Sequence, residues 1–163
     1  MSTDKIAYAT TTAITITLNS LVSASASGRS GAAVDNTTNL YDDALLYVQV
    51  AVTTGLANDK AVYVYLYGSE DGTNFNNSSN LEVNVGSDAI TGIDSPTALK
   101  GPAVIPITAN SKTYRGVWNV AAFFGGVMPR KWGVVIQNYA GAPLSGTIGD
   151  SVVTYTGITY TNA

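Results

Sequence analysis

The sequence contains no cysteine and no histidine, and these two absences exclude several kinds of chemistry. Without cysteine the chain has no disulfide framework, no thiolate zinc site and no thiol nucleophile. Without histidine it lacks the Ser-His-Asp and Cys-His catalytic arrangements, His-ligated metals and the usual general base at neutral pH. We therefore expect no enzymatic activity and no cofactor.

Charge is also scarce, since only 12% of the 163 residues are charged and the net charge is −3. The only adjacent cationic pair is Arg130-Lys131, too little to neutralise phosphates, so we expect no nucleic-acid partner. The longest apolar stretch, 117–129, is too short to span a bilayer and is interrupted by Asn119 and two glycines, so we expect no membrane partner. The first residues carry no signal peptide, which predicts synthesis in the cytoplasm.

Period-2 alternation of apolar and polar side chains dominates the chain, and it predicts strands. In 60–68, Val62, Val64 and Leu66 alternate with three tyrosines. The turn residues of 54–59 lead us to expect an antiparallel hairpin between the second and third runs. The predicted strands are residues 13–18, 45–52, 60–68, 81–85, 103–108, 112–120, 132–138 and 151–160.

About eight short strands without an alternating helix rhythm predict an all-β fold. The strand count and the uneven loops favour a two-sheet antiparallel jelly-roll-like β-sandwich. We expect one domain over 13–163, preceded by residues 1–12, which carry little to bury and form an extended arm or edge strand.

Three features are candidate contact surfaces. The stripe of Tyr63, Tyr65 and Tyr67 would serve as a sugar-stacking platform or a protein interface, because tyrosine is enriched at interfaces; the alternative is a core face under a loop. The apolar segment 121–129, with Phe123 and Phe124, is either a plug over one end of the sandwich or a subunit contact. Arg130 and Lys131 would pair with carboxylates such as Asp42 or Glu70.

Two acidic features fit local structure better than chemistry. Asp42 and Asp43 are adjacent, so strand alternation separates their side chains, and we expect a solvated turn before a strand. The Asp71-Gly72 segment lacks the spacing of a calcium-binding EF-hand loop, and we expect a turn held by hydrogen bonds between Asn side chains and the local backbone.

Three segments resemble small structural proteins of tailed bacteriophages, and the similarity extends over roughly residues 10–160. These segments are 28–44 (GRSGAAVDNTTNLYDDA), 67–73 (YGSEDGT) and 124–133 (FGGVMPRKWG).

The resemblance implies a virion protein, most simply a capsid decoration or cement protein that binds the assembled head and bridges capsomers. Its partners would be the major capsid protein and further copies of itself, with a trimer favoured, and it would lie on the head surface rather than the tail. The expected contact residues are Tyr8, Thr10, Thr11, Thr12, Tyr63, Tyr65, Tyr67, Phe123, Phe124, Arg130 and Lys131.

A second hypothesis comes from the turn that contains Gly68, Ser69, Asp71, Gly72 and Phe75. This pattern resembles a hairpin of discoidin-like and carbohydrate-binding jelly rolls. It implies a carbohydrate-binding or receptor-binding tail component, with sugar held in a cleft at a loop end.

Overall fold

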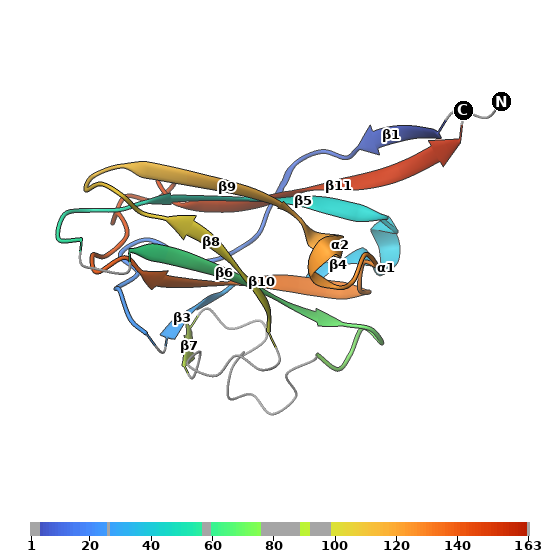
Figure 1. The fold of residues 1–163 in the computed structure, drawn as a ribbon. Coiled ribbons are helices and arrows are strands. Elements are labelled where there is room, and N and C mark those ends of the chain that lie inside the picture. Colours follow the sequence, from blue (N-terminus) through green and yellow to red (C-terminus); the bar gives the residue numbers. More distant parts are fainter. Residues whose placement is uncertain (1–3, 26, 57–59, 76–88, 92–98, 163) are drawn as a thin grey trace.

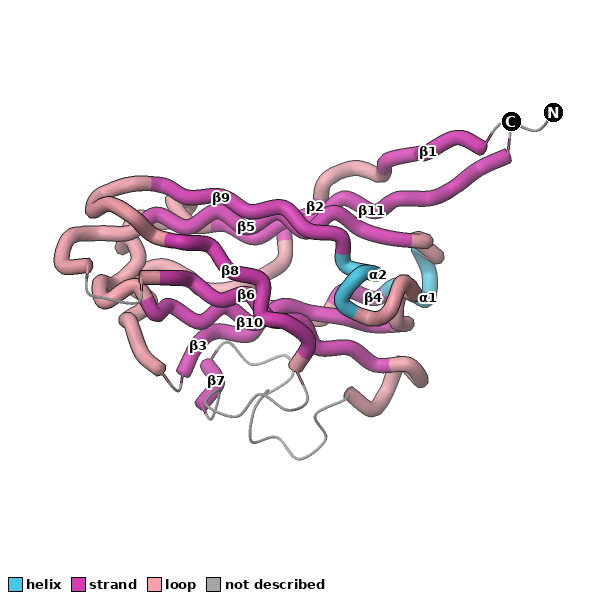
Figure 2. The backbone as a smooth tube through the Cα atoms, viewed as in Figure 1, coloured by secondary structure: helices cyan, strands magenta, loops and turns pink. Residues whose placement is uncertain are grey.

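The computed structural model describes residues 4–25, 27–56, 60–75, 89–91 and 99–162, which form two antiparallel sheets packed face to face (Figures 1 and 2). Sheet A contains β1 (Asp4–Tyr8), β2 (Thr12–Ala13), β5 (Asp43–Ala51), β9 (Thr113–Asn119) and β11 (Val152–Asn162). Sheet B contains β3 (Ser27–Ser30), β4 (Val34–Asp35), β6 (Ala61–Ser69), β7 (Ala89–Thr91), β8 (Lys100–Pro106) and β10 (Lys131–Tyr139). The predicted all-β sandwich is confirmed.

The strand order is that of a jelly roll. In sheet A, β11 lies between β1 and β5, and β9 follows β5; in sheet B, β10 lies between β3 and β6, and β8 follows β6. The last two strands are thus inserted between early and middle strands, one in each sheet. This arrangement is the double Greek key that defines the fold.

The expected hairpin between residues 45–52 and 60–68 is wrong. These runs became β5 and β6, which lie in different sheets: β5 pairs with β11 and β9, whereas β6 pairs with β10 and β8. Both strands are rich in apolar side chains. Each can therefore lie between two neighbouring strands at the centre of its own sheet. The predicted strand 81–85 lies outside the described residues.

The core lies between the sheets and is built from the alternating inward side chains. Leu46, Val48 and Val50 of β5 are fully buried, as are Val134 and Ile136 of β10. Burial of each such side chain contributes about 1.5–3 kcal/mol. The Trp132 ring packs edge-on against Tyr155 of the opposite sheet, with ring centroids 5.5 Å apart, and joins the two layers.

Residues 13–18, predicted as one strand, pass from sheet A to sheet B. The backbone N–H of Ile14 donates to Val153 in sheet A, and the carbonyl of Thr15 accepts from Ala32 beside sheet B. Ile14 and Leu18 are buried in the core. The alternation was therefore correct about burial, although only Thr12–Ala13 pairs as a strand, because the segment leaves the sheet to change layers.

Two single-turn helices lie at one end of the sandwich (Figure 1): α1 (Asn36–Asn39) and α2 (Val120–Phe123). Asp35 caps α1, because its carboxylate accepts from the backbone N–H of Thr37 at 2.8 Å. Leu40 ends α1 in the left-handed conformation, with φ 52°. In the described part of the chain, no helix is long and apolar enough to cross a bilayer.

Candidate interaction surface

The first and last strands of sheet A form a ribbon that projects beyond the sandwich (Figures 1 and 2). Five cross-strand pairs join β1 to residues 158–162 of β11, whereas β5 stops opposite Ile158. Ile6 lies opposite Tyr160, and Tyr8 lies opposite Ile158, so these four side chains share one face of the ribbon. Ile6, Tyr8 and Tyr160 are 55%, 62% and 58% exposed. The described part of the expected arm is thus an edge strand with an exposed apolar face.

The threonines of the arm follow β1 and lie along the sandwich. The hydroxyls of Thr11 and Thr156 are 2.7 Å apart, and the Thr12 hydroxyl donates to the carbonyl of Thr10. All three arm threonines, Thr10, Thr11 and Thr12, are exposed. The Thr11 hydroxyl and the pairing of Thr12 with Tyr155 attach the segment to sheet A, and the three side chains leave polar surface beside it.

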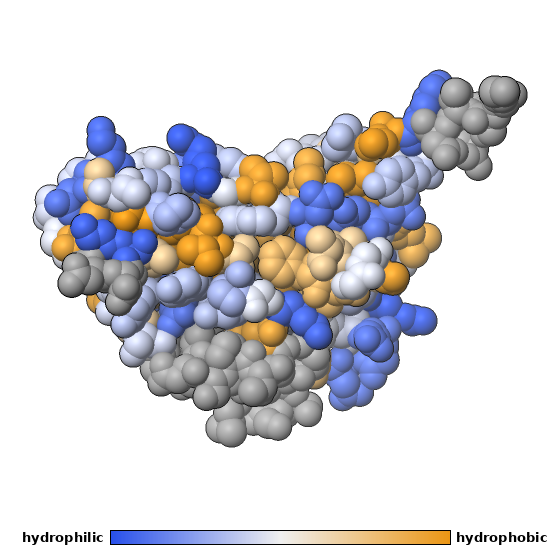
Figure 3. All heavy atoms as spheres, in the orientation of Figure 1, coloured by the Kyte–Doolittle hydropathy of each residue, from blue (hydrophilic) through white to orange (hydrophobic). Residues whose placement is uncertain are grey.

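A groove of about 740 Å³ opens at the base of the ribbon. Its lining includes Tyr160 of the ribbon, Val117 and Trp118 of β9, and the α2 residues Ala122 and Phe123. The ribbon's apolar face and the groove are therefore continuous at Tyr160. Figure 3 shows hydrophobic atoms over α2 and its surroundings on this end of the molecule.

Two carboxylates that line the groove accept hydrogen bonds within the subunit. Asp43 Oδ1 accepts from the backbone N–H groups of Ala44 and Ala121, and its Oδ2 accepts from Asn119 Nδ2 at 2.8 Å. The backbone N–H of Tyr160 donates to Asp42 Oδ2 at 2.7 Å. The expectation of a solvated turn is wrong for Asp43, which is buried because it accepts these three donors.

The outer face of sheet A is broad and nearly uncharged. Because Leu46, Val48 and Val50 point into the core, the alternate residues Leu45, Tyr47 and Gln49 of β5 point outward. Their partners on β9 are Asn119, Val117 and Arg115, and on β11 they are Thr156, Thr154 and Val152. The Arg115 Nε donates to Tyr47 Oη and Gln49 Oε1, so the charged group on these rows lies against the sheet.

The predicted tyrosine interface is wrong for two of its three members. Tyr65 and Tyr67 are 7% and 0% exposed and form a second apolar cluster with Val135 and Leu99 on the outer face of sheet B. The Tyr67 hydroxyl donates to the carbonyl of Gly31 at 2.6 Å, and burial raises the pKa of this hydroxyl far above its ordinary value. Tyr63 remains half-buried at the rim of the cluster.

The segment after β9 has the character of a plug with an exposed tip. Val120 and Ala121 are buried, and Phe123 and Phe124 are half-buried against the main core. Val127 at the tip is 73% exposed. Of the two phenylalanines, Phe123 lines the groove, so the segment closes the core and also offers surface.

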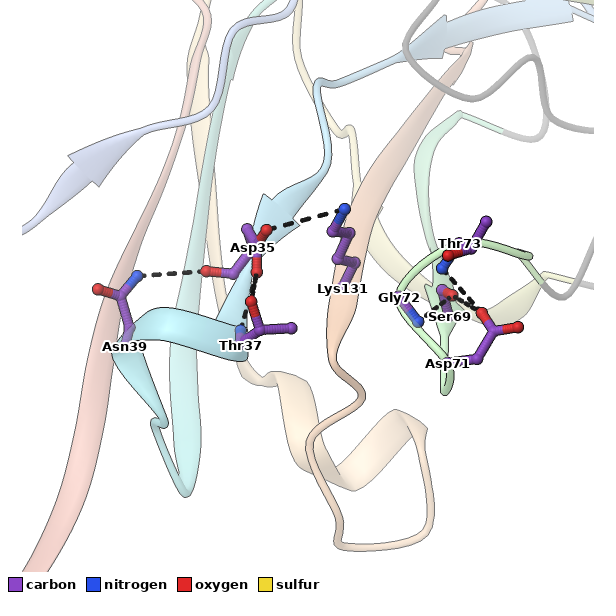
Figure 4. A network of polar contacts seen from close by, with 8 residues as sticks. All are labelled: Asp35, Thr37, Asn39, Ser69, Asp71, Gly72, Thr73 and Lys131. Carbon is purple, nitrogen blue, oxygen red and sulfur yellow. Dashed lines mark hydrogen bonds and ion pairs between the residues drawn. The ribbon is translucent and has the colours of Figure 1, made fainter.

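The basic pair has a different acidic partner from those expected. Lys131 Nζ lies 3.7 Å from Asp35 Oδ2, next to the cap of α1 (Figure 4). The reason is strand register, since Lys131 of β10 lies opposite Asp35 of β4. The Thr37 hydroxyl and backbone N–H, with a smaller effect from Lys131, lower the pKa of Asp35. Arg130 is exposed.

The Asp71 turn is held by local hydrogen bonds. Asp71 Oδ1 accepts from the backbone N–H of Thr73 and from the hydroxyl of Ser69 (Figure 4). It also accepts from the backbone N–H of Asn74. These bonds, that of Thr73 first, lower the pKa of Asp71. The turn was expected, and in its described part the side chain that binds the backbone is that of Asp71, whereas Asn76 and Asn77 lie outside the described residues. Phe75, which follows the turn, packs edge-on against Tyr67.

Three surface residues were missed from the sequence: Ile6, Val117 and Tyr160. Each sits in an alternating run, and alternation alone does not say which face is outside. Only the pairing of the two chain ends brings Ile6 and Tyr160 together. No family model, curated protein or solved structure matches this chain.

Proposed function

We propose that this protein is a structural component of a virion, a capsid decoration protein that binds the assembled head of a tailed bacteriophage. In this role the protein works by contact alone. The outer face of sheet A would lie on the shell of the major capsid protein, and the ribbon end would meet neighbouring copies. A homo-oligomer, most simply a trimer, would occupy symmetric positions on the head.

The difference between the two outer sheet faces carries this proposal. The face of sheet B supports a second apolar cluster that contains Tyr67 and Val135, whereas no described segment lies over the face of sheet A (Figure 1). That free face presents Leu45, Tyr47 and Val117 among threonines. Aromatic and apolar groups with few charges are typical of the centre of a protein interface.

Stabilisation of a head would follow from binding linkage. A ligand that binds only the assembled shell stabilises it by its binding free energy, about 2.7 kcal/mol for each site when the free protein is at 100 times its dissociation constant. Many copies on one shell sum this effect, and linked copies add avidity.

The test is co-sedimentation of the purified protein with heads that lack it, and separately with unassembled capsid subunits. We expect saturable binding to heads, no binding to free subunits, and a higher temperature of head disruption. Tyr47→Glu and Thr154→Glu place charges on the proposed contact face, away from the groove, and should abolish binding. Val104→Glu, at an exposed position of sheet B, is the matched control. Heads that bind the charged variants as well as the wild type would contradict the proposal.

The groove supports one alternative, a carbohydrate-binding or receptor-binding tail component. Trp118, Phe123 and Tyr160 line it together with Asp42 and Asn119, and sugar sites combine aromatic rings with such acids and amides. Glycan-array binding that is lost in Trp118→Ala would favour this function. Electron microscopy of the virion would separate the two, because decoration requires many copies over the head and a tail component only a few.

A further inference from the structure

We propose that the ribbon of one copy, residues 4–8 with 158–162, occupies the groove at the base of the ribbon in a second copy. The occupant is thus another molecule of this chain, and the contact joins two different surfaces of one subunit. The inference deepens the proposed function, on which it rests for its biological setting, by naming the residues that link decorating copies.

The ribbon needs a partner. Two antiparallel strands alone are marginally stable in water, and a third element with an apolar face is usually required. The described ribbon residues project from the sandwich, and the apolar face of Ile6, Tyr8 and Tyr160 is more than half exposed. Exposed apolar groups gathered on one projecting element are typical of an interaction site.

The groove offers complementary chemistry. Val117, Ala122 and Phe123 give the groove an apolar lining. Each subunit therefore presents both an apolar ribbon face and an apolar groove.

Ribbon and groove together come close to the lower limit of a stable interface. Five cross-strand pairs make up the ribbon and ten residues line the groove, with Tyr160 common to both. Stable protein interfaces use roughly 20–30 residues a side. Because each copy would contribute both surfaces, either mutual exchange in a dimer or a closed ring of copies satisfies them all.

Cysteine cross-linking tests the contact directly, because the natural chain contains no cysteine. The single variants Ile6→Cys and Ala122→Cys are purified, mixed and oxidised. We expect a disulfide-linked pair in the mixture and little product from either variant alone. Ala7→Cys, on the opposite face of the ribbon, mixed with Ala122→Cys is the matched control and should not cross-link.

Oligomer mass gives the second measurement. Native mass spectrometry and light scattering should show an oligomer for the wild type, and Tyr8→Ser should weaken it about tenfold or more, since the apolar surface of Tyr8 would be left without its partner. Circular dichroism and thermal unfolding confirm that the variant is folded. A double variant, Ile6→Cys with Ala122→Cys, reports closure: only dimers indicate mutual exchange, and larger linked species indicate a ring.

Two results would overturn the inference. One is a wild-type protein that stays monomeric at every concentration tested. The other is efficient cross-linking of Ile6→Cys to itself, with no disulfide between Ile6→Cys and Ala122→Cys in the mixture, which would place two ribbons edge to edge. Neither result bears on binding of the protein to heads, so failure here is separable from failure of the proposed function.

Discussion

The carboxylate of Asp43 accepts a hydrogen bond from the backbone N–H of Ala121 at 2.9 Å, and this bond joins the start of β5 to the first turn of α2. Ala121 lies 78 residues further along the chain. The same carboxylate takes the side-chain amide of Asn119, so one buried acid holds the end of β9, the α2 turn and the rim of the groove together.

Replacing Asp43 by Ala should lower the free energy of unfolding by about 2–3 kcal/mol, because hydrogen bonds to a charged group are lost and buried donors are left unpaired. Urea unfolding measures the change. Asp42→Ala is the control, since it removes one bond to an exposed backbone group and water can replace it; we expect a loss below about 0.5 kcal/mol. Equal losses in the two variants would contradict the role assigned to Asp43.

The Tyr67 hydroxyl gives a second prediction. Tyr67→Phe removes the donor to the buried carbonyl of Gly31 and should cost about 1–2 kcal/mol of stability. Tyr63→Phe, at the rim of the same cluster, should change stability much less. Thermal unfolding of the two variants side by side makes the comparison, and a larger loss in Tyr63→Phe would show that the buried hydroxyl is unimportant.

Gly133 leaves the space that the Tyr67 ring occupies. It lies opposite Tyr67 in the register of β10 and β6, and a Cβ placed there would overlap the tyrosine ring. Because Tyr67 is fully buried and cannot move away, Gly133→Ala should cost about 2–3 kcal/mol through overpacking.

Gly157→Ala is the matched case. Its Cβ would meet the ring of Tyr41, which is half-exposed and able to shift, so we expect a smaller loss of stability. The denaturant midpoint of unfolding is measured for both variants and should be lower for Gly133→Ala. A lower midpoint for Gly157→Ala would contradict the packing argument.

Asp71 predicts an acid-sensitive turn. Its folded pKa lies below the ordinary value of 3.8, so folding favours the carboxylate. The stabilisation is therefore complete above about pH 4 and is lost as the pH falls below it. We expect hydrogen-exchange protection of the Thr73 and Asn74 amides to decrease between pH 5 and pH 2, relative to amides in β10.

The control for this turn is Asp71→Asn, which keeps one oxygen acceptor but does not ionise in this range. Its Thr73 and Asn74 amides should show protection that changes no more with pH than that of β10. A wild-type turn that keeps its protection in acid would contradict the assigned role of the carboxylate.

Local alternation was a sound guide to strands and to burial. The Val–Tyr pattern of 60–68 predicted β6, and its apolar residues Val62, Val64 and Leu66 are fully buried. Alternation placed the three tyrosines on one face but did not say whether that face is buried. Packing buries Tyr65 and Tyr67. Such patterns describe what each segment can bury, so they succeed wherever a strand has one clear inner face.

Pairing between distant segments could not be predicted. The turn after β5 contains ordinary hairpin residues, but whether the chain returns in the same sheet or crosses to the other depends on which strands arrive later, here β9, β10 and β11. The pairing of β1 with β11 and the contact of Gly157 with Tyr41 were equally unpredictable, because in each case the partner lies far away in the sequence.

The hydrogen bond from the Tyr160 backbone N–H to Asp42 makes the two edges of the ribbon different. The side chain of Asp42 occupies part of the β11 edge where β5 has ended, so another strand added there would have to displace a carboxylate. The outer edge of β1 has no such cover from any described residue. The ribbon is consequently open to extension along β1 and guarded along β11, a difference that disfavours the indefinite edge-to-edge stacking through which β-proteins form fibres.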